Sequence, residues 1–392
     1  MTASLSPLQQ RIASKAMPPI FKITCAAALC LVATSLFFPV AVLADRPVTW
    51  LQSGVELLGF MGLDCIAFAA LLGMAVPGTS AAFALCFAAL GLVGTLAPLL
   101  LLAGEATVAS DSVGFWLTAL ALLLLACAGL SKLSSVQTDK AWPRHAIPLA
   151  LGAWVIAFWQ IGVQAFDVPR VLLPAPALII QSIIDKWDVL LDDFNVTVLH
   201  SALVGYILGC GGGFLLGILI DRSRFLQRGL LPVCALASAM PLVGIAPIMV
   251  MWFGFEWHSK AAVVALMTFF PMLVNTFAGL AATGRMELDL MRSYAAGHLR
   301  TLLLLRLPTA LPFLFNGLKV ATTLALIGAI VAEFFGSPTV GMGFRISSEA
   351  ARMNMGLVWA TIVVAALAGT AIYALIAWAE RALTFWHPSQ RL

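Results

Sequence analysis

Long apolar runs, separated by short polar segments, follow one another along the whole chain. Each run is about 20 residues long, which is the length of a helix that crosses a bilayer. The runs cover residues 20–43, 53–76, 79–103, 113–131, 147–165, 197–220, 230–252, 261–281, 309–332 and 357–379. This pattern predicts an all-α polytopic membrane protein with about ten transmembrane helices and both termini on one side.

The distribution of lysine and arginine predicts which side that is. With the N-terminus inside, fifteen of these residues fall in inner segments and six in outer segments, and Lys319 alone falls within a span. The inner ones are Arg11, Lys15, Lys22, Lys132, Lys140, Arg144, Arg222, Arg224, Arg228, Arg285, Arg292, Arg300, Arg306, Arg381 and Arg391. Because cytoplasmic loops carry the excess of positive charge, we predict that both termini are inside.

Composition excludes several other classes of protein. The 392 residues are 61% hydrophobic and only 10% charged, too few charges to cover a soluble core. The formal net charge of +4 is spread over membrane-flanking loops rather than gathered in a patch, which argues against nucleic acid as a partner. All seven cysteines fall within predicted spans without metal-ligand spacing, which indicates packing residues.

A polar loop at residues 132–146 divides the chain into two parts. We expect a four-helix membrane extension at residues 1–131 and a second membrane domain at residues 147–392. In the extension, Glu56 and Asp64 are carboxylates on or near a span, with either a structural or a functional role. The first span is long for a signal peptide, so we interpret it as an anchor, with cleavage after Ala44 as the alternative.

Three local patterns mark the second part. Residues 177–190 place isoleucines and leucine on one stripe, which predicts an amphipathic helix in the outer interface. Glycines at residues 209–217 predict close packing against a neighbouring helix. Pro241 and Pro247 predict bends that fit either a helix beside a transport pathway or a purely structural kink.

The segment RSYAAGHLRTLLLLRLPTALP, residues 292–312, is unusual because it concentrates basic groups in a chain with few charges. Its apolar and basic positions predict two short helices with the basic groups in water, separated at Ala295 to Gly297 and ended by Pro308. Pattern alone leaves two alternatives open: a basic helix lying on anionic lipid, and a docking helix for a partner protein.

The spacing in this segment carries a resemblance. Asp289, Leu290 and Met291 are followed after three residues by Ala295, then after nine by Leu305, and finally by Leu307-Pro308. The order resembles the cytoplasmic "EAA" loop of ABC-importer permeases: E-A-A, three residues, G, nine residues, I, any residue, L-P.

Further landmarks are similar to the nitrate/sulfonate/taurine branch of that family. They are Leu173-Pro174-Ala175-Pro176, Trp252-Phe253-Gly254 with Ser259-Lys260, Leu311-Pro312, Gly317-Leu318-Lys319 and Val331-Ala332-Glu333. The resemblance covers about residues 145–387 and leaves the first four spans outside.

The resemblance implies a type I importer permease fold in the C-terminal six helices, located in the bacterial inner membrane. It implies that residues 285–308 form the coupling loop to a cytoplasmic ABC ATPase dimer. The coupling residues would be Asp289, Arg292, Ser293, Tyr294, Ala295, Gly297, Arg300, Leu307 and Pro308. Other implied partners are an extracytoplasmic solute-binding protein, a second permease copy and the lipid bilayer. The implied cargo is a nitrate-, sulfonate- or taurine-like anion, or a vitamin or pyrimidine precursor.

Residues near a transport pathway are expected at Met240, Pro241, Pro247, Lys319 and Glu333. Lys319 follows Pro308 by 11 residues, which is about 16 Å along a helix and places it near mid-membrane. An ionisable group at that depth has either a transport role or a role in a charge pair between helices. For Glu333 the alternative is an interfacial carboxylate.

Catalysis and nucleotide binding are not expected of this chain. It has no G-x-x-x-x-G-K-[ST] phosphate loop and no metalloprotease or hydrolase motif, so we expect no enzyme activity and no bound cofactor. ATP and Mg²⁺ would bind the partner ATPase. A secondary transporter or channel is the alternative, which internal repeats or intramembrane acidic residues would indicate.

Overall fold

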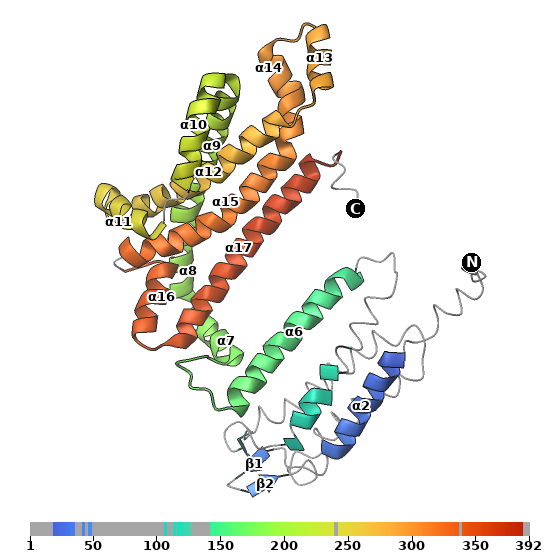
Figure 1. Cartoon of the computed structure of the whole chain (residues 1–392). Helices are drawn as coiled ribbons and strands as arrows, with labels where there is room; N and C mark the ends of the chain where they lie inside the picture. The colour runs from blue at the N-terminus through green and yellow to red at the C-terminus, as the bar shows by residue number, and fades with distance from the viewer. Residues whose placement is uncertain are drawn as a thin grey trace, which may run out of the picture. The chain divides into compact units, whose positions relative to one another are not determined.

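A computed structural model describes most of the second half of the chain and short parts of the first (Figure 1). The described residues are 19–35, 41–43, 46–48, 106–107, 113–114, 116–121, 123–124, 127, 142–238, 242–336 and 339–386. The chain forms two compact units, Met1–Pro169 and Arg170–Leu392. Glu56, Asp64 and the predicted spans at 53–76 and 79–103 lie outside the described residues.

The first unit contains helices α2 (Pro19–Ser35) and α6 (Trp142–Ala165). It also contains three short strands, β1 (Ala41–Leu43), β2 (Arg46–Val48) and β3 (Ala106–Thr107). Both other strands pair antiparallel with β1, in the order β2-β1-β3. These strands depart from the predicted all-α class, and the apolar pattern had no two-residue period that would have shown them. Helices nevertheless make up nearly all the regular structure described.

The second unit is a bundle of helices, and its elements follow one another with short connections (Figure 1). They are α7 (Pro176–Asp185), α8 (Trp187–Phe194), the π-helical segment η1 (Asn195–Ala202), α9 (Leu203–Arg222), α10 (Arg224–Ser238), α11 (Leu242–Phe253), α12 (Trp257–Ala281), α13 (Arg285–Ser293), α14 (His298–Thr301), the π-helical segment η2 (Leu302–Arg306), α15 (Leu307–Gly336), α16 (Met342–Ala351) and α17 (Met355–Leu383).

Four continuous helical stretches among the described residues are long and apolar enough to cross a membrane. They are Trp187–Arg222, Trp257–Ala281, His298–Gly336 and Met355–Leu383. They contain the predicted spans at 197–220, 261–281, 309–332 and 357–379, so these four predictions are confirmed. The chain is therefore a multi-pass membrane protein.

The predicted span at 230–252 differs from the structure. Two shorter helices divide this region, because α10 ends at Ser238 and α11 begins at Leu242. Apolar composition measures how much of a segment avoids water, but it does not specify the direction of the chain. A single apolar run can therefore hold two helices.

The predicted stripe at 177–190 is also only partly realised. A break at Lys186 separates α7 from α8, and the two edges of the stripe on α7 have different surroundings. Ile179 is buried, whereas Ile180 and Ile184 are exposed. Consecutive helical residues point about 100° apart, so one edge of the stripe packs against α17 and the other stays free.

Helix α12 lies at the centre of the second unit, between α9 and α15. Every fourth residue of α9 is a glycine where it meets α12: Gly205, Gly209, Gly213 and Gly217. A Cβ atom at Gly217 would lie 2.7 Å from Thr276 Cβ, and one at Gly205 would lie 2.5 Å from the main-chain oxygen of Ala261. The predicted close packing is thus confirmed, and the two helix backbones approach each other directly.

Candidate functional site

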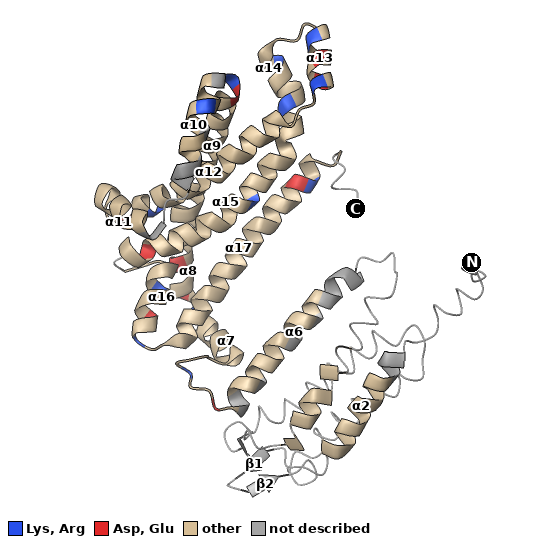
Figure 2. Ribbon diagram, viewed as in Figure 1, with Lys and Arg blue, Asp and Glu red and all other residues tan. Residues whose placement is uncertain are grey.

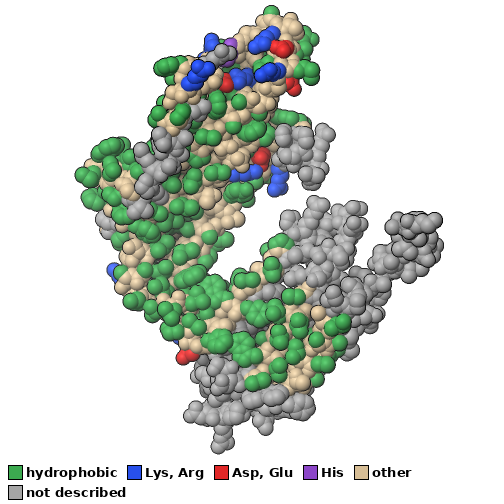
Figure 3. Space-filling model, viewed as in Figure 1, with side chains coloured by type: hydrophobic (Ala, Val, Ile, Leu, Met, Phe, Trp, Pro, Cys, Tyr) green, Lys and Arg blue, Asp and Glu red, His purple; other side chains and the backbone are tan. Residues whose placement is uncertain are grey.

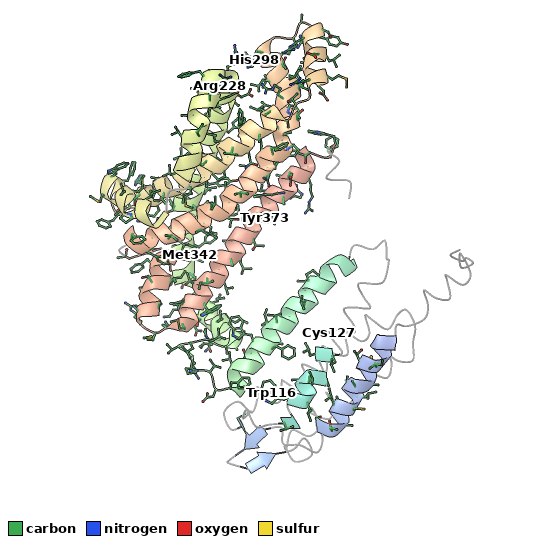
Figure 4. The ribbon with its side chains drawn as sticks, viewed as in Figure 1. Trp116, Cys127, Arg228, His298, Met342 and Tyr373 are labelled. Atoms are coloured by element: carbon green, nitrogen blue, oxygen red, sulfur yellow. The ribbon has the colours of Figure 1, made fainter. Side chains whose placement is uncertain are left out.

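The segment that resembles the EAA loop forms one end of the second unit. Helices α13 and α14 project there beyond the ends of α12 and α15, while α16 lies at the opposite end of α15 (Figure 1). Basic side chains gather at the projecting end, on the loop and on the start of α10 (Figures 2 and 3). Figure 4 labels Arg228 and His298 at this end and Met342 at the other.

The turn between α13 and α14 explains the spacing of the motif. The Ala295 amide donates to Arg292 O at 2.9 Å, and the Ala296 amide donates to Met291 O at 3.0 Å. These two bonds form a Schellman motif, in which the residue after the helix cap adopts the left-handed conformation. That residue is Ala295, with φ of 51°. The position where the motif has glycine is therefore the one position of the turn that favours glycine.

The nearby Gly297 has a different role. Its φ is −66° and its ψ is 167°, an extended conformation that any residue adopts, and it caps the start of α14. No atom lies within 4 Å of where its Cβ would be. Gly297 therefore does not replace the motif glycine, although it lies only two residues away.

Replacing Ala295 with glycine is expected to stabilise this turn. Relief of the left-handed conformation outweighs the greater backbone freedom of glycine by about 0.5–1 kcal/mol. Hydrogen exchange at the Ala296 amide would then slow by about two- to fivefold. Gly297→Ala is the matched control and should change this rate little. Faster exchange in Ala295→Gly would contradict the assignment of the turn.

The outer surface of the loop exposes large apolar side chains beside basic ones. Met286, Leu290, Tyr294, Leu299 and Leu303 are all exposed, and Tyr294 is 76% exposed. Asp289 and Arg292 form an ion pair of 2.8 Å on the same surface, and both side chains remain in solvent. Ser293 Oγ donates to Leu290 O, and Arg300 is exposed. A mixed apolar and basic surface of this kind is typical of a protein-docking site.

Arg306 corrects the expectation that the basic groups of this segment lie in water. Its guanidinium forms a two-pronged ion pair with Asp221 at the end of α9, with distances of 2.5 and 2.8 Å. Its Nη2 also donates to Leu280 O near the end of α12 at 2.9 Å. The sequence expectation failed because Asp221 is 85 residues away along the chain. Leu307 and Pro308 are half-buried in the first turn of α15.

The opposite end of α15 carries a buried polar network around Glu333. Both carboxylate oxygens of Glu333 accept hydrogen bonds, one from Thr197 Oγ1 and one from the Gly343 amide, each at 2.7 Å. Thr197 Oγ1 in turn accepts from the Met342 amide at 2.8 Å. Glu333 is 1% exposed, so its carboxylate is enclosed by the protein.

A second carboxylate completes this arrangement. Asp193 at the end of α8 accepts from the Gly341 amide at 2.8 Å and from Arg345 Nε at 2.7 Å. Asp193 and Glu333 thus bind amides at the N-terminus of α16, where the helix dipole favours negative charge. The network ties α16 to η1, α8 and α15.

Lys260 lies near this network but binds main-chain oxygens. Its Nζ donates to Gly336 O at 2.6 Å, to Glu256 O at 3.0 Å and to Phe255 O. The side chain is 2% exposed and joins the start of α12 to the end of α15. A buried ammonium group held in this way stabilises two helix ends.

The remaining predicted pathway residues do not form one cluster. Lys319 forms an ion pair with Glu380 of α17, and the ring of Tyr373 lies 6.0 Å from its Nζ. This pair joins α15 to α17, as one of the two predicted roles requires. Pro247 is exposed within α11. Met240 and Pro241 lie outside the described residues.

An apolar cavity of about 740 Å³ lies elsewhere in the second unit. It is lined by side chains of α7, α8, η1, α9, α15 and α17, of which Tyr206 and Thr322 are polar. Tyr206 donates its hydroxyl to Leu318 O, so this group is already satisfied. The cavity suits hydrocarbon better than a charged solute.

Sequence reasoning missed Asp193, Thr197, Asp221, Arg345 and Glu380. Asp193 and Arg345 lie in segments predicted outside the membrane, whereas Thr197 lies in a predicted span and Asp221 and Glu380 each directly follow one. Polar groups at that depth are expensive unless they have partners. That cost was a usable signal, but the sequence does not show which residues are the partners.

Comparison with known proteins identifies the family of the chain. Residues 209–385 match the family described as "Binding-protein-dependent transport system inner membrane component". The chain is also 32% identical over 231 residues to a probable ABC transporter permease protein of Haemophilus influenzae. That alignment covers 59% of this chain and 94% of the relative. The chain belongs to this family of ABC-importer permeases.

Two further relatives have names that state a substrate. The permease is 32% identical over 252 residues to the riboflavin transport system permease protein of Chloroflexus aurantiacus, covering 63% of this chain and 92% of that one. It is 31% identical over 236 residues to the formylaminopyrimidine transport permease protein of Halalkalibacterium halodurans, covering 60% and 94%. The predicted resemblance is confirmed, and the protein is a membrane component of transport rather than a catalytic enzyme.

Proposed function

We propose that this permease is the transmembrane subunit of an ATP-driven importer that moves a small solute delivered by an extracytoplasmic binding protein. The observation that carries the proposal is the exposed loop at 285–308. Its motif spacing matches its geometry, because the glycine position of the motif is the left-handed Ala295. Family membership supports the same function.

The proposal includes a full topology. About ten helices would cross the inner membrane with both termini in the cytoplasm, so that α13 and α14 lie in the cytoplasm and α16 outside. The C-terminal six would form the type I importer fold. The excess of lysine and arginine in the inner segments supports this orientation.

The partners follow from the number of docking loops. An ATPase dimer offers two grooves, and this chain contributes one loop of the motif type, so a two-fold homodimer is the simplest assembly. A heterodimer with a second permease is the alternative. ATP and Mg²⁺ would bind the ATPase, and this chain would bind no cofactor. The loops at 166–196 and 333–356 would receive the binding protein.

The substrate is expected to be a small anion such as nitrate, a sulfonate or taurine, or a vitamin or pyrimidine precursor. Relatives named for riboflavin and formylaminopyrimidine transport support the second group. Screening ligands against the cognate binding protein would decide between them, because its pocket is expected to set selectivity.

If the ATPase docks on this loop, replacing Tyr294 should strongly weaken ATPase binding. Tyr294→Ser removes the most prominent aromatic side chain of the loop surface without changing a buried contact. Loss of such an aromatic anchor costs about 2 kcal/mol, so the affinity for the ATPase should fall by about 30-fold. Binding of the purified ATPase to the permease in nanodiscs measures this change.

The matched control is Tyr373→Ser, the same exchange at an exposed tyrosine of α17. It should leave ATPase binding unchanged. The proposed function fails if solute uptake into vesicles proceeds fully on an ion gradient without any ATPase. That result would support the secondary transporter or channel instead.

A further inference from the structure

Three spanning helices meet at Arg306, directly behind the exposed loop. Arg306 is the last residue of η2 and precedes the first residue of α15. Its guanidinium binds Asp221 near the C-terminal end of α9 and Leu280 O near the C-terminal end of α12. One side chain therefore connects the loop-side ends of α9, α12 and α15.

This contact is well shielded and has a fixed geometry. The side chains of Arg306 and Asp221 are 16% and 8% exposed. Two parallel N–H···O bonds fix both the distance and the orientation of a guanidinium and a carboxylate, which a single bond does not. The third bond, to Leu280 O, adds a helix end whose carbonyl groups favour a positive charge.

The ion pair of the loop surface and one ion pair at the end of α16 have a different character. Arg292 with Asp289 and Arg352 with Glu349 are each three residues apart on one helix, and both arginines are largely exposed. Pairs between residues so close in sequence contribute little to stability and do not join distant elements. Arg306 with Asp221 joins elements 85 residues apart.

A fourth element is attached at the same place. Gln227 of α10 donates its side-chain amide to the main-chain oxygen of Asp221 at 3.2 Å. Asp221 thus holds Arg306 through its carboxylate and α10 through its carbonyl group. Movement of the loop relative to α9 would have to break or carry these contacts.

We propose that Arg306 and Asp221 form a transmission joint, which carries movement of the ATPase-bound loop into a concerted movement of α9, α12 and α15. Both are positioning residues, and neither contacts ATP or the solute. The proposal rests on the proposed importer function. Its physical basis is stiffness: α15 continues the helix that begins at His298, so with the joint intact the ends of α9 and α12 follow the loop and α15 as one body, and without it they are no longer held to them.

The experiment compares four variants of the full permease in complex with its ATPase and binding protein: Arg306→Lys, Arg306→Gln, Asp221→Asn and the double variant Arg306→Gln with Asp221→Asn. Three quantities are measured in proteoliposomes or nanodiscs. They are retention of the ATPase, the melting temperature of the complex, and solute imported per ATP hydrolysed.

Each single neutral variant leaves one charge without its partner and is expected to lower the melting temperature. The double variant removes both charges, so its melting temperature should recover towards that of the wild type. Solute imported per ATP should nevertheless remain about tenfold lower in the double variant. Arg306→Lys keeps the charge but loses the two-pronged geometry, and it should bind the ATPase normally with reduced import per ATP.

If the double variant recovers both its melting temperature and its solute import per ATP, the proposal is wrong and the ion pair has only a structural role. A wild-type ratio of import to ATP hydrolysis in Arg306→Lys would also overturn it. Failure of the importer function itself is distinguishable, because the wild-type permease would then retain no ATPase and show no ATP-dependent import.

Discussion

Glu333→Gln is expected to destabilise the folded permease by about 2–3 kcal/mol. Glu333 is almost fully buried, and both of its oxygens accept hydrogen bonds from donors. Glutamine has one oxygen, so either Thr197 or the Gly343 amide loses its acceptor. The substitution also removes a negative charge from the N-terminus of α16. Equilibrium unfolding in mixed detergent micelles measures this loss.

The same substitution has a matched control at an exposed position. Glu256 precedes α12 with an exposed side chain, so Glu256→Gln should change the unfolding free energy by less than about 0.5 kcal/mol. Equal effects of the two substitutions would show that the network around Glu333 does not hold α16. Thr197→Val is a second test of the same network, because it removes one donor to Glu333 and the acceptor of the Met342 amide. It should also lower the unfolding free energy.

The spanning helices of the second unit were predictable because their signal is local. Burial in hydrocarbon requires about 20 apolar residues in sequence, and α12, α15 and α17 each contain such a run. The division of the apolar run 230–252 between two helices, α10 and α11, was not predictable in the same way. It depends on contacts of α11 with α12 and α15, which are made only in the folded bundle.

The turn of the loop at 285–308 was predictable to the residue, whereas the polar networks were not. The motif spacing identified Ala295, and the left-handed turn lies at that residue. A turn forms among neighbours in sequence, so spacing is enough to locate it. In contrast, Asp193 pairs with Arg345, 152 residues away, and single-residue patterns contain no information on such a pairing.

Lys319 shows how much a charged residue within a span predicts by itself. Its depth along the helix indicated a functional residue or an ion pair, and the sequence did not distinguish them. In the structure it pairs with Glu380, which lies 61 residues away near the end of α17. A role of Lys319 in the pathway remains a prediction, and any such role would require the pair to open or to remain beside the solute.

Gly213→Leu is expected to have the other large effect, because α9 and α12 pack backbone against backbone at this residue. A Cβ at Gly213 would lie 3.0 Å from Leu273 N, 3.1 Å from Met272 Cβ, and closer still to Phe269 O. Backbone atoms at a helix centre do not move aside as side chains do. The helices must separate, at a cost of about 3 kcal/mol or more in unfolding free energy.

The control for Gly213→Leu lies two residues away on the same helix. Gly211 is exposed, and no atom lies within 4 Å of where its Cβ would be. Gly211→Leu should therefore be neutral, or stabilising by up to about 1 kcal/mol, because leucine has the higher helix propensity. Unfolding of both variants in mixed micelles compares them directly. Equal destabilisation would mean that glycine serves the flexibility of α9, whereas loss in Gly213→Leu alone shows that close contact with α12 requires it.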